Sequence, residues 1–218
     1  GVEASSAYRL VTRNAVSIIF SLPLSYKEKI RQVDGVAAVS YGNWFGGIYI
    51  DEKNFFANFA VEPASYLSLY PEIVVPEKEK ADFLRDRRGF VAGRKLADRF
   101  GWHLGDIVTL KGTIYPGDWP MTLRGVYQGR DKSTDENQLF FHWDYLNERL
   151  KERFPNLIDP PRQPASGIYF IRRAVRGAQG ARDRGDQRHV DGRGIRRGDA
   201  YAVAVARSRR PGRVDAGL

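Results

Sequence analysis

The stretch FVAGRKLADRFGWHLGDIVTLKG, residues Phe90–Gly112, decides the fold of this 218-residue chain. Its first two residues, Phe90-Val91, predict a short buried strand. Arg94–Phe100 predicts a helix of one or two turns, because apolar residues recur on one face at helical spacing. Gly101 stands where such a helix needs a left-handed cap. Asp106–Leu110 alternates apolar and polar residues and predicts a second strand.

Two glycines, Gly101 and Gly105, bracket the tripeptide Trp102-His103-Leu104. Glycine adopts positive φ at no steric cost, so this segment predicts a tight link from a helix end to a strand start. Asp106 can accept hydrogen bonds within that turn. All of these residues therefore have structural roles.

Working outward, the same patterns predict further elements on both sides. Extended segments are expected at Ala7–Phe20, Val36–Ile50, Asn54–Pro63, Met121–Gly129 and Ser166–Arg172, with a hairpin or meander around Asp51-Glu52-Lys53. Helices are expected in ASYLSLYPEIV, in the charged EKEKADFLRDRR and in the second half of QLFFHWDYLNERLKERF.

A short amphipathic helix is also expected in LSYKEKIRQVDGV. Ser25 and Glu28 have the spacing of a capping box, Ile30 and Val33 form an apolar stripe, and Gly35 stands at the expected C-terminal end. Strands and helices thus mix with short connections. The fold class is α+β, with a mixed, largely antiparallel sheet or sheets and short packed helices.

The net charge of +9 is unevenly distributed along the chain. Residues 1–171 hold 22 Lys and Arg against 21 Asp and Glu, whereas residues 172–218 hold 13 Arg against 5 Asp. The body is neutral and the basicity belongs to the tail. We therefore expect one domain over 1–171, with room for two subdomains, and an Arg/Gly-rich, unstructured tail over 172–218.

Other classes of protein are excluded or disfavoured by composition. The chain has no Cys, which excludes disulfides and Cys-ligated zinc. No run of about 20 apolar residues predicts a transmembrane helix. The start, GVEASSAYRL, lacks an initiator Met and the pattern of a signal peptide, so we expect a segment of a longer protein.

No combination of residues predicts a catalytic, cofactor or metal site. His103 and His142 are far apart and lack a ligand at metal-binding spacing, which favours ordinary surface or half-buried histidines. The segment GVYQGRDKST differs from a phosphate loop because Arg130 and Asp131 follow the last glycine.

Two further groups of residues can each be interpreted in two ways, as structural or as functional. Asp131, Asp135 and Glu136 do not match the spacing of a calcium loop, which favours a solvated loop or capping carboxylates over a cation site. Trp44 and Phe45 in GNWFGG are interpreted either as core residues or as an exposed contact patch for a ligand or partner.

The unit at Phe90–Gly112, followed by MTLRGVYQG, resembles the periplasmic core domain of MacB-like permeases of the FtsX-type ABC transporters. The segments DGVAAVSY, NWFGGIYIDEKNFFANFAV and GRDKSTDENQLFFHWDYLNE add to the resemblance, which covers about residues 1–171. The matching positions are Leu96, Ala97, Gly101, Gly105, Asp106, Val108, Leu110, Gly125 and Val126.

The resemblance implies a non-catalytic domain on the periplasmic side of the bacterial inner membrane, between the first and second transmembrane helices. It would couple helix movement, driven by a separate ABC ATPase, to efflux or extraction of a substrate. Implied partners are that ATPase, a second permease copy or a paired permease, and a periplasmic adaptor. The chain departs from the family pattern by lacking the transmembrane helices and the ATPase.

In this family the last strand continues into a turn and an amphipathic helix, whereas here the composition changes at Arg172-Arg173. After this point there is no Lys, Glu, Phe, Trp, Thr or Asn. The abundant residues Arg, Gly, Ala, Asp and Val have codons that begin with C or G. We interpret the tail as GC-rich DNA translated after a frameshift. Loss of the closing helix would expose an apolar face and lower solubility.

Two other functions stay open at this stage. The 13 arginines of the tail could bind nucleic acid or an anionic surface. Interspersed Asp residues, a single aromatic at Tyr201 and the absence of a repeat disfavour nucleic acid as a partner. A secreted enzyme with an unrecognised site is the third class.

Overall fold

The computed structural model describes residues 9–15, 22–153, 165–174 and 201–204. The elements run in chain order β1 (Arg9–Asn14), β2 (Leu22–Pro23), α2 (Tyr26–Arg31), β3 (Val36–Trp44), β4 (Ala57–Val61), α3 (Pro63–Leu69), β5 (Ile73–Val74), α4 (Glu77–Arg85), β6 (Gly89–Gly93), α5 (Arg94–Phe100), β7 (Ile107–Gly112), β8 (Gly117–Gly129), β9 (Gln138–His142), α6 (Trp143–Arg153), β10 (Ala165–Ser166), β11 (Ile168–Arg173) and β12 (Tyr201–Ala204).

In the described part of the chain, ten strands form one mixed sheet in the order β12-β1-β11-β3-β4-β9-β6-β8-β5, with β7 paired to β8. Two pairs, β4 with β9 and β6 with β8, are parallel, and the other neighbours are antiparallel. β2 and β10 form a separate two-stranded sheet. The predicted α+β class with a largely antiparallel mixed sheet is confirmed.

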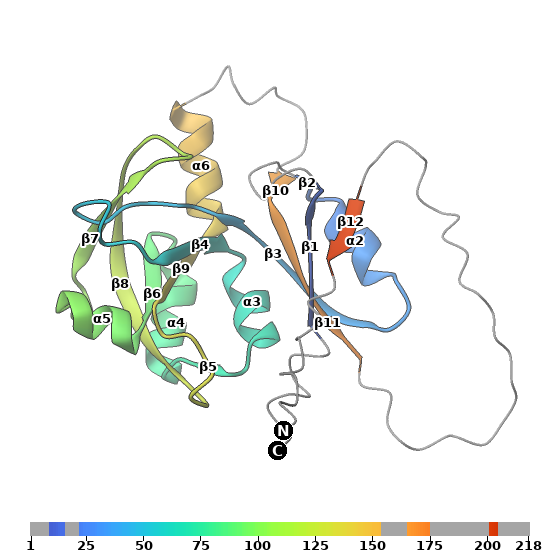
Figure 1. The fold of residues 1–218 in the computed structure, drawn as a ribbon, viewed down its shortest axis with the longest axis horizontal. Coiled ribbons are helices and arrows are strands. Elements are labelled where there is room, and N and C mark those ends of the chain that lie inside the picture. The colour runs from blue at the N-terminus through green and yellow to red at the C-terminus, as the bar shows by residue number, and fades with distance from the viewer. Residues whose placement is uncertain (1–8, 16–21, 154–164, 175–200, 205–218) are drawn as a thin grey trace, which may run out of the picture.

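The sheet divides into two parts that share β3 (Figure 1). We call β1, β11, α2, the β2–β10 pair and β12 the base, and we call β4–β9 with α3–α6 the distal part. Residues 36–42 of β3 pair with β11 of the base, and residues 42–44 pair with β4 of the distal part. The two pairings overlap at Gly42 alone.

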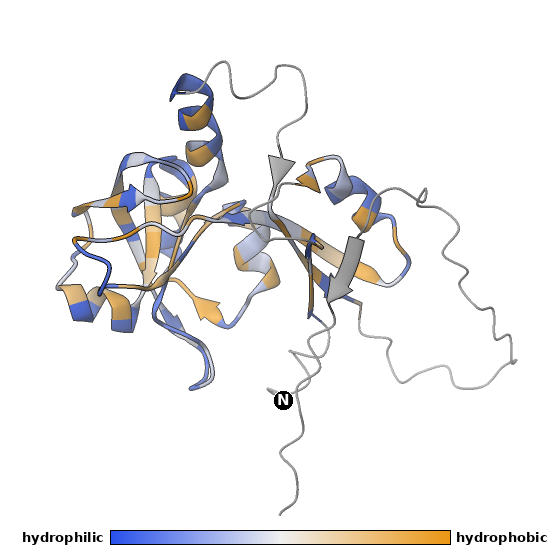
Figure 2. Cartoon of the chain, turned by 45° about the horizontal axis from the view of Figure 1, so that its top comes forward, coloured by the Kyte–Doolittle hydropathy of each residue, from blue (hydrophilic) through white to orange (hydrophobic). Residues whose placement is uncertain are grey.

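The distal part encloses an aromatic core beneath α5 and α6. Phe45, Phe90, Trp119 and Phe141 are fully buried there, and Phe45 contacts both Trp119 and Phe141 edge to face. Hydrophobic residues follow the strands of this part, whereas the loop between β8 and β9 is hydrophilic (Figure 2). Part of the aromatic content of the sequence thus forms a well-packed core in this region.

The unit at Phe90–Gly112 folds as its sequence predicts. α5 covers the predicted residues and ends at Gly101, whose φ of 63° is left-handed. Gly105 also has a positive φ, of 95°. The Asp106 carboxylate accepts a hydrogen bond from the His103 backbone N–H at 2.8 Å. The two glycines and the aspartate therefore form the expected tight turn into β7.

The capping box predicted at Ser25 is wrong. Ser25 has helical backbone angles, φ −57° and ψ −18°, and its side chain makes no capping bond. A capping side chain needs an extended backbone at this position, which Ser25 does not have. The apolar stripe is also incomplete, because Ile30 packs on the base whereas Val33 is 58% exposed.

Two segments assigned to the tail lie in strands. β11 continues to Arg173, two residues beyond the predicted boundary, because Arg172 and Arg173 still pair with β3. Tyr201–Ala204 forms β12 and pairs with β1, so the prediction of an unstructured tail does not hold for these four residues. The open edge of β1 offers unpaired backbone groups that an extended segment can satisfy. The remainder of the tail lies outside the described residues.

Candidate functional site

The candidate site is the junction between the base and the distal part, where α3 meets β3. β4 leaves the sheet after Val61, and the Glu62 N–H donates to the Tyr41 carbonyl at 3.0 Å. Within the described residues, no strand pairs with this edge of β3 between Val36 and Tyr41. Side chains can therefore pass around the edge of β3 from one face of the sheet to the other.

α2 and α3 lie on opposite faces of β3, because successive strand residues point to opposite sides. Val39 and Tyr41 pack in the apolar cluster beneath α2. Ser40, between them, is fully buried and faces Ser65 of α3, with 2.8 Å between the two hydroxyl oxygens. The edge of β3 is thus enclosed from both sides.

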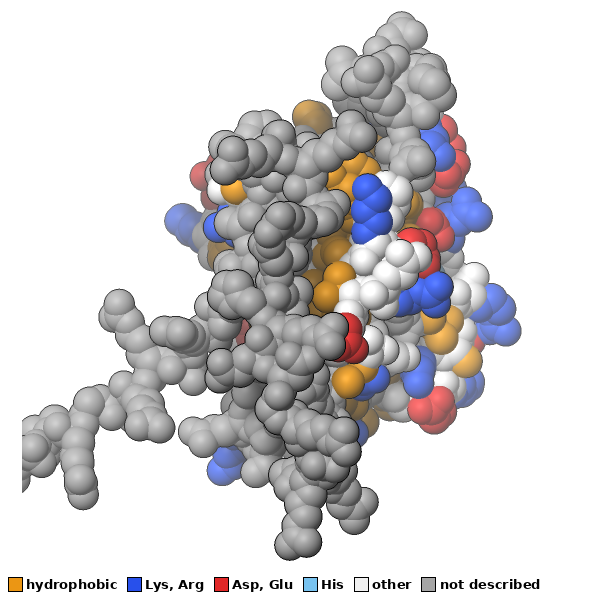
Figure 3. All heavy atoms as spheres, turned by 90° about the vertical axis from the view of Figure 1, so that its right-hand side faces the viewer, with side chains coloured by type: hydrophobic (Ala, Val, Ile, Leu, Met, Phe, Trp, Pro, Cys, Tyr) orange, Lys and Arg blue, Asp and Glu red, His pale blue; other side chains and the backbone are white. Residues whose placement is uncertain are grey.

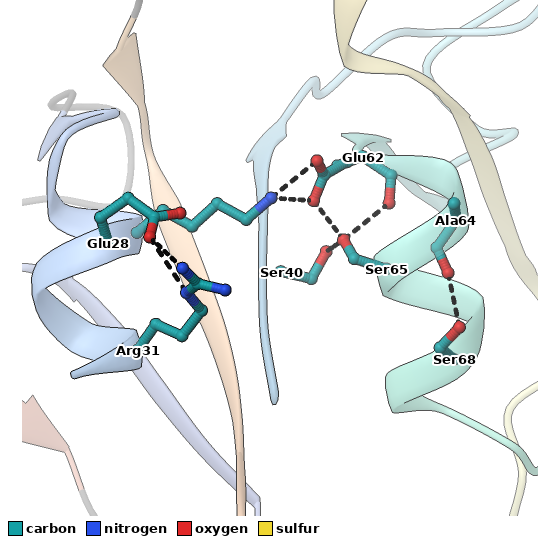
Figure 4. Close-up of polar contacts among 8 residues, drawn as sticks. Glu28, Arg31, Ser40, Glu62, Ala64, Ser65 and Ser68 are labelled. Atoms are coloured by element: carbon teal, nitrogen blue, oxygen red, sulfur yellow. Dashed lines mark hydrogen bonds and ion pairs between the residues drawn. The ribbon is translucent and has the colours of Figure 1, made fainter. Parts of the chain in front are cut away.

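A polar network joins the two helices around this edge, and we call it the α3 clasp: Lys27, Glu62, Ser65 and Ser40 (Figure 4). The Lys27 ammonium donates to both carboxylate oxygens of Glu62, each at 2.7 Å. It also lies 5.2 Å from the centre of the Tyr41 ring, within the range of a cation–π contact. Lys27 therefore carries the connection from α2 to α3.

Ser65 extends the clasp into the sheet. Its hydroxyl donates to the Glu62 carboxylate, and since a hydroxyl has one proton, the Ser40 hydroxyl must donate to Ser65. Each side chain of the clasp then has a hydrogen-bond partner. The side chains of Lys27 and Glu62 are 26% and 29% exposed. Their pairing is worth between roughly 1 kcal/mol for a surface pair and about 1.5–3 kcal/mol for a shielded charged hydrogen bond.

The other end of α3 has a second tie to the base. Arg9 of β1 forms an ion pair with Glu72, which follows α3, and its guanidinium lies 4.8 Å from the Tyr70 ring centre. Arg172 of β11 donates to the Ser68 carbonyl at 3.4 Å. Basic side chains of the base thus meet acceptors at both ends of α3.

Between these polar ends lies an aromatic contact, which we call the wedge: Phe170 of β11 against Tyr66 and Tyr70. The ring centres of Phe170 and Tyr66 are 5.1 Å apart, and those of Phe170 and Tyr70 are 5.9 Å apart. Burial raises the pKa of Tyr70 to about 12, although Arg9 opposes this shift. Burial also raises the pKa of Tyr41, as do the Glu62 and Asp144 carboxylates. Both phenols are therefore neutral at physiological pH.

The histidines considered from the sequence occupy contrasting places. His103 is exposed at the turn before β7. His142, at the end of β9, is buried, and its Nε2 lies 2.7 Å from the Phe83 carbonyl. Because a carbonyl only accepts, Nε2 carries the proton in the neutral ring. Burial lowers the pKa of His142, against the opposing effect of the bond to Phe83.

The loop between β8 and β9 carries the acidic residues Asp131, Asp135 and Glu136, whose carboxylates accept local hydrogen bonds. Asp131 accepts from the Ser133 N–H at 3.0 Å, and the Ser133 hydroxyl lowers the pKa of Asp131. Glu136 accepts from the Gly129 N–H at 2.8 Å. Asp135 accepts from the Asn137 N–H at 2.8 Å. These are the capping carboxylates of a solvated loop, and in the described chain no three His, Asp or Glu side chains gather as metal ligands.

The alternative that treated Trp44 and Phe45 as a contact patch is wrong for Phe45. Phe45 is fully buried in the distal core, and Trp44 is half-buried against Phe59 with 5.0 Å between ring centres. The neighbouring Gly46 has a φ of 66°, a left-handed conformation that lets the chain turn directly after Phe45. The core interpretation of this segment is therefore confirmed for Phe45.

Helix α2 of the base carries charges of both signs, at Glu28, Lys29 and Arg31. On the side of the molecule drawn in Figure 3, the described basic and acidic side chains are interspersed with hydrophobic ones. Within the described ranges, no helix is both long and apolar enough to span a bilayer.

Comparison with known proteins identifies the fold. The sequence matches no family model and no curated protein. The chain is similar in structure to the periplasmic region of MacB from Actinobacillus actinomycetemcomitans, with a TM-score of 0.51 and 9% identity over 80% of this chain and 78% of that one. It also matches the extracellular domain of the noncanonical ABC-type transporter YknZ from Gram-positive bacteria, with a TM-score of 0.48 and 15% identity over 77% of this chain and 84% of that one.

This likeness agrees with the resemblance of the sequence. The chain has the fold of the MacB periplasmic region, a mixed sheet with a few short helices. Sequence reasoning located the strand–helix–strand unit of this fold. It missed the α3 clasp, since Lys27 and Glu62 are 35 residues apart and neither belongs to a motif.

Proposed function

We propose that this chain is the extracytoplasmic domain of an ABC transporter permease and has no catalytic role of its own. The observation that carries the proposal is the pairing of its first and last domain strands. β1 and β11 are antiparallel neighbours, and Arg9 lies opposite Arg172. Both ends of the domain therefore leave the sheet at the same side, as an insertion between two membrane-spanning helices requires.

The domain would act by changing its position rather than by chemistry. A separate ABC ATPase would move the transmembrane helices, and β1 and β11 would receive that movement because they continue into those helices. The domain would then expel or extract a substrate outside the cytoplasmic membrane. Such coupling needs two states that the nucleotide favours differently.

The partners follow from the same proposal. We propose that residues 1–171 form the domain, that it works beside a second copy or a paired permease on the periplasmic side of the inner membrane, and that a periplasmic adaptor can join it. The neutral charge of 1–171 disfavours nucleic acid as the ligand of the domain.

The gene itself provides the test. Sequencing across both ends should reveal an apolar span of about 20 residues upstream of β1 and further spans downstream of β11, once a single-base shift near codon 172 is restored. A neighbouring ATPase gene is also expected. DNA that encodes no apolar span on either side, in any frame, would rule out the proposal.

The Arg-rich tail offers an independent check on the alternative. Filter binding of single-stranded DNA at two salt concentrations would detect phosphate contacts by a steep loss of affinity with salt. We expect no affinity that depends on residues 175–218. Binding that disappears when these residues are deleted would favour the nucleic-acid alternative instead.

A further inference from the structure

The two parts of the chain are connected in an unusual way for a continuous sheet. β4 and β9 of the distal part each have three residues that pair with a strand on both sides, whereas β3 has one such residue, Gly42. A Cβ at Gly42 would lie 2.6 Å from the Ala60 carbonyl, so the strands approach closely at this point. Along the strands from β11 to β6, the sheet is therefore narrowest at Gly42.

The base is also held weakly by apolar packing on its α2 side. α2 has no buried residue, and the cluster beneath it contains three buried side chains, Leu22, Val39 and Tyr169. Interfaces of this kind within a chain behave like transient interfaces, so relative movement is expected unless the contact is large and apolar.

Outside β3, the described contacts between the two parts concentrate at α3. The wedge of Phe170, Tyr66 and Tyr70 supplies an apolar centre, which continues into the buried cluster that Ile168 of β11 shares with α3. The ion pairs Lys27–Glu62 and Arg9–Glu72 form its rim at the two ends of the helix. Their side chains are 16% to 29% exposed, so water can take over the hydrogen bonds when the parts separate. An apolar centre with a polar rim is the anatomy of a non-obligate interface, whose partners can separate.

We propose that the chain is built to bend at Gly42 and that α3 is the latch that holds the arrangement described here. Releasing the two ion pairs frees the distal part to rotate relative to the base, with β3 as the hinge. This inference stands on the geometry of the junction and does not depend on the proposed transport function. In a permease it would let the distal part respond to movement that enters through β1 and β11.

The experiment measures the distance between the two parts in the full chain. The protein has no Cys, so Val33→Cys on the base and Leu84→Cys on α4, both at exposed positions, accept spin labels without background. Pulsed electron–electron double resonance then gives the distribution of distances between the two spin labels. The latch variant is Glu62→Gln with Glu72→Gln, which removes both negative charges without changing side-chain size.

The matched control is Glu28→Gln. It removes the Glu28–Arg31 ion pair, which lies within α2, is more than half exposed and does not reach α3 (Figure 4). We expect one narrow distance for the parent and the control. The latch variant should show a second population displaced by more than about 2 Å, a size typical of genuine domain rearrangements.

A charge exchange separates latch release from damage to the fold. Glu62→Lys alone should populate the second distance, and adding Lys27→Glu should restore the parent distribution. The proposal is overturned if the latch variant keeps the parent distance, if Glu28→Gln shifts it equally, or if exchange fails to restore it. Global unfolding of the latch variant, seen by circular dichroism, would also overturn it, because the pairs would then hold the fold rather than a hinge.

Discussion

The distal part and the base of this domain are stabilised by different kinds of contact. The distal part buries several large aromatic side chains completely, and one of them, Phe45, contacts both Trp119 and Phe141. The base consists of a few strands and the helix α2, which has no buried residue of its own, and it is attached to the distal part by β3, two ion pairs and the wedge. The distal part is therefore stabilised mainly by the packing of buried side chains, whereas the attachment of the base depends more on ion pairs that water can replace.

The largest effect is expected in the distal core. Phe45→Ala should lower the free energy of unfolding by about 3–5 kcal/mol, because it empties a fully buried aromatic position. Chemical denaturation checks this value. The control Phe55→Ala, at a residue 68% exposed, should change stability by less than about 0.5 kcal/mol. Equal effects of the two substitutions would contradict the placement of Phe45.

A smaller effect is expected where the two parts meet. Gly42→Val should cost about 1–3 kcal/mol, because its Cβ would collide with the Ala60 carbonyl and backbone must move. Ala37→Val, at an exposed position on the same strand, serves as the control and should be nearly neutral. If Gly42→Val were as stable as the parent in denaturant, this result would contradict the close approach of β3 to the Ala60 carbonyl at Gly42.

The pH dependence of stability should come from the distal part. The pKa of His142 is lowered in the folded chain, so the unfolded chain takes up a proton first as the pH falls. Stability is therefore intact above pH of about 6.5 and declines below it, by at most about 1.4 kcal/mol per pH unit. Unfolding titrations between about pH 5.5 and 7.5 would detect this slope.

His142→Gln should flatten the slope, since glutamine does not titrate and its amide can still donate to the Phe83 carbonyl. The control His103→Gln, at an exposed histidine, should leave the slope as it is. A slope that survives His142→Gln would assign the pH dependence to other groups.

The smallest effect belongs to the surface of the base. Removing the Glu28–Arg31 pair by Arg31→Met should cost less than about 0.5 kcal/mol, because both side chains are exposed. A double-mutant cycle with Glu28→Gln measures the coupling. A coupling well above this value would mean that α2 is held more firmly than its exposure indicates.

Local chemistry made part of this structure predictable from the sequence. Helix α5 and its cap at Gly101 follow from spacing and from one glycine, and the turn at Asp106 needs only neighbouring residues. Phe45 was ambiguous, because its burial depends on strands β8 and β9, more than 70 residues further along the chain. Adjacent Trp44 gives the same local pattern and remains half-buried.

The junction could not be predicted in the same way. Its main ion pair joins Lys27 to Glu62 across the edge of β3, and no spacing rule relates two charged residues brought together by sheet topology. The parallel pairing of β4 with β9 is also non-local. At Ser25 the sequence predicted a feature that the structure lacks. The residues have the spacing of a capping box, but the Ser25 backbone is helical and its side chain makes no capping bond.

The central claim is that both parts of the domain lie outside the cytoplasmic membrane, and labelling in intact cells tests it most directly. The membrane-bound product of the complete gene would carry a single Cys in the base, Val33→Cys, or in the distal part, Asp98→Cys, both at exposed positions. A membrane-impermeant maleimide, admitted to the periplasm where an outer membrane is present, should label both variants before the inner membrane is broken. Labelling of either variant only after lysis would contradict the account.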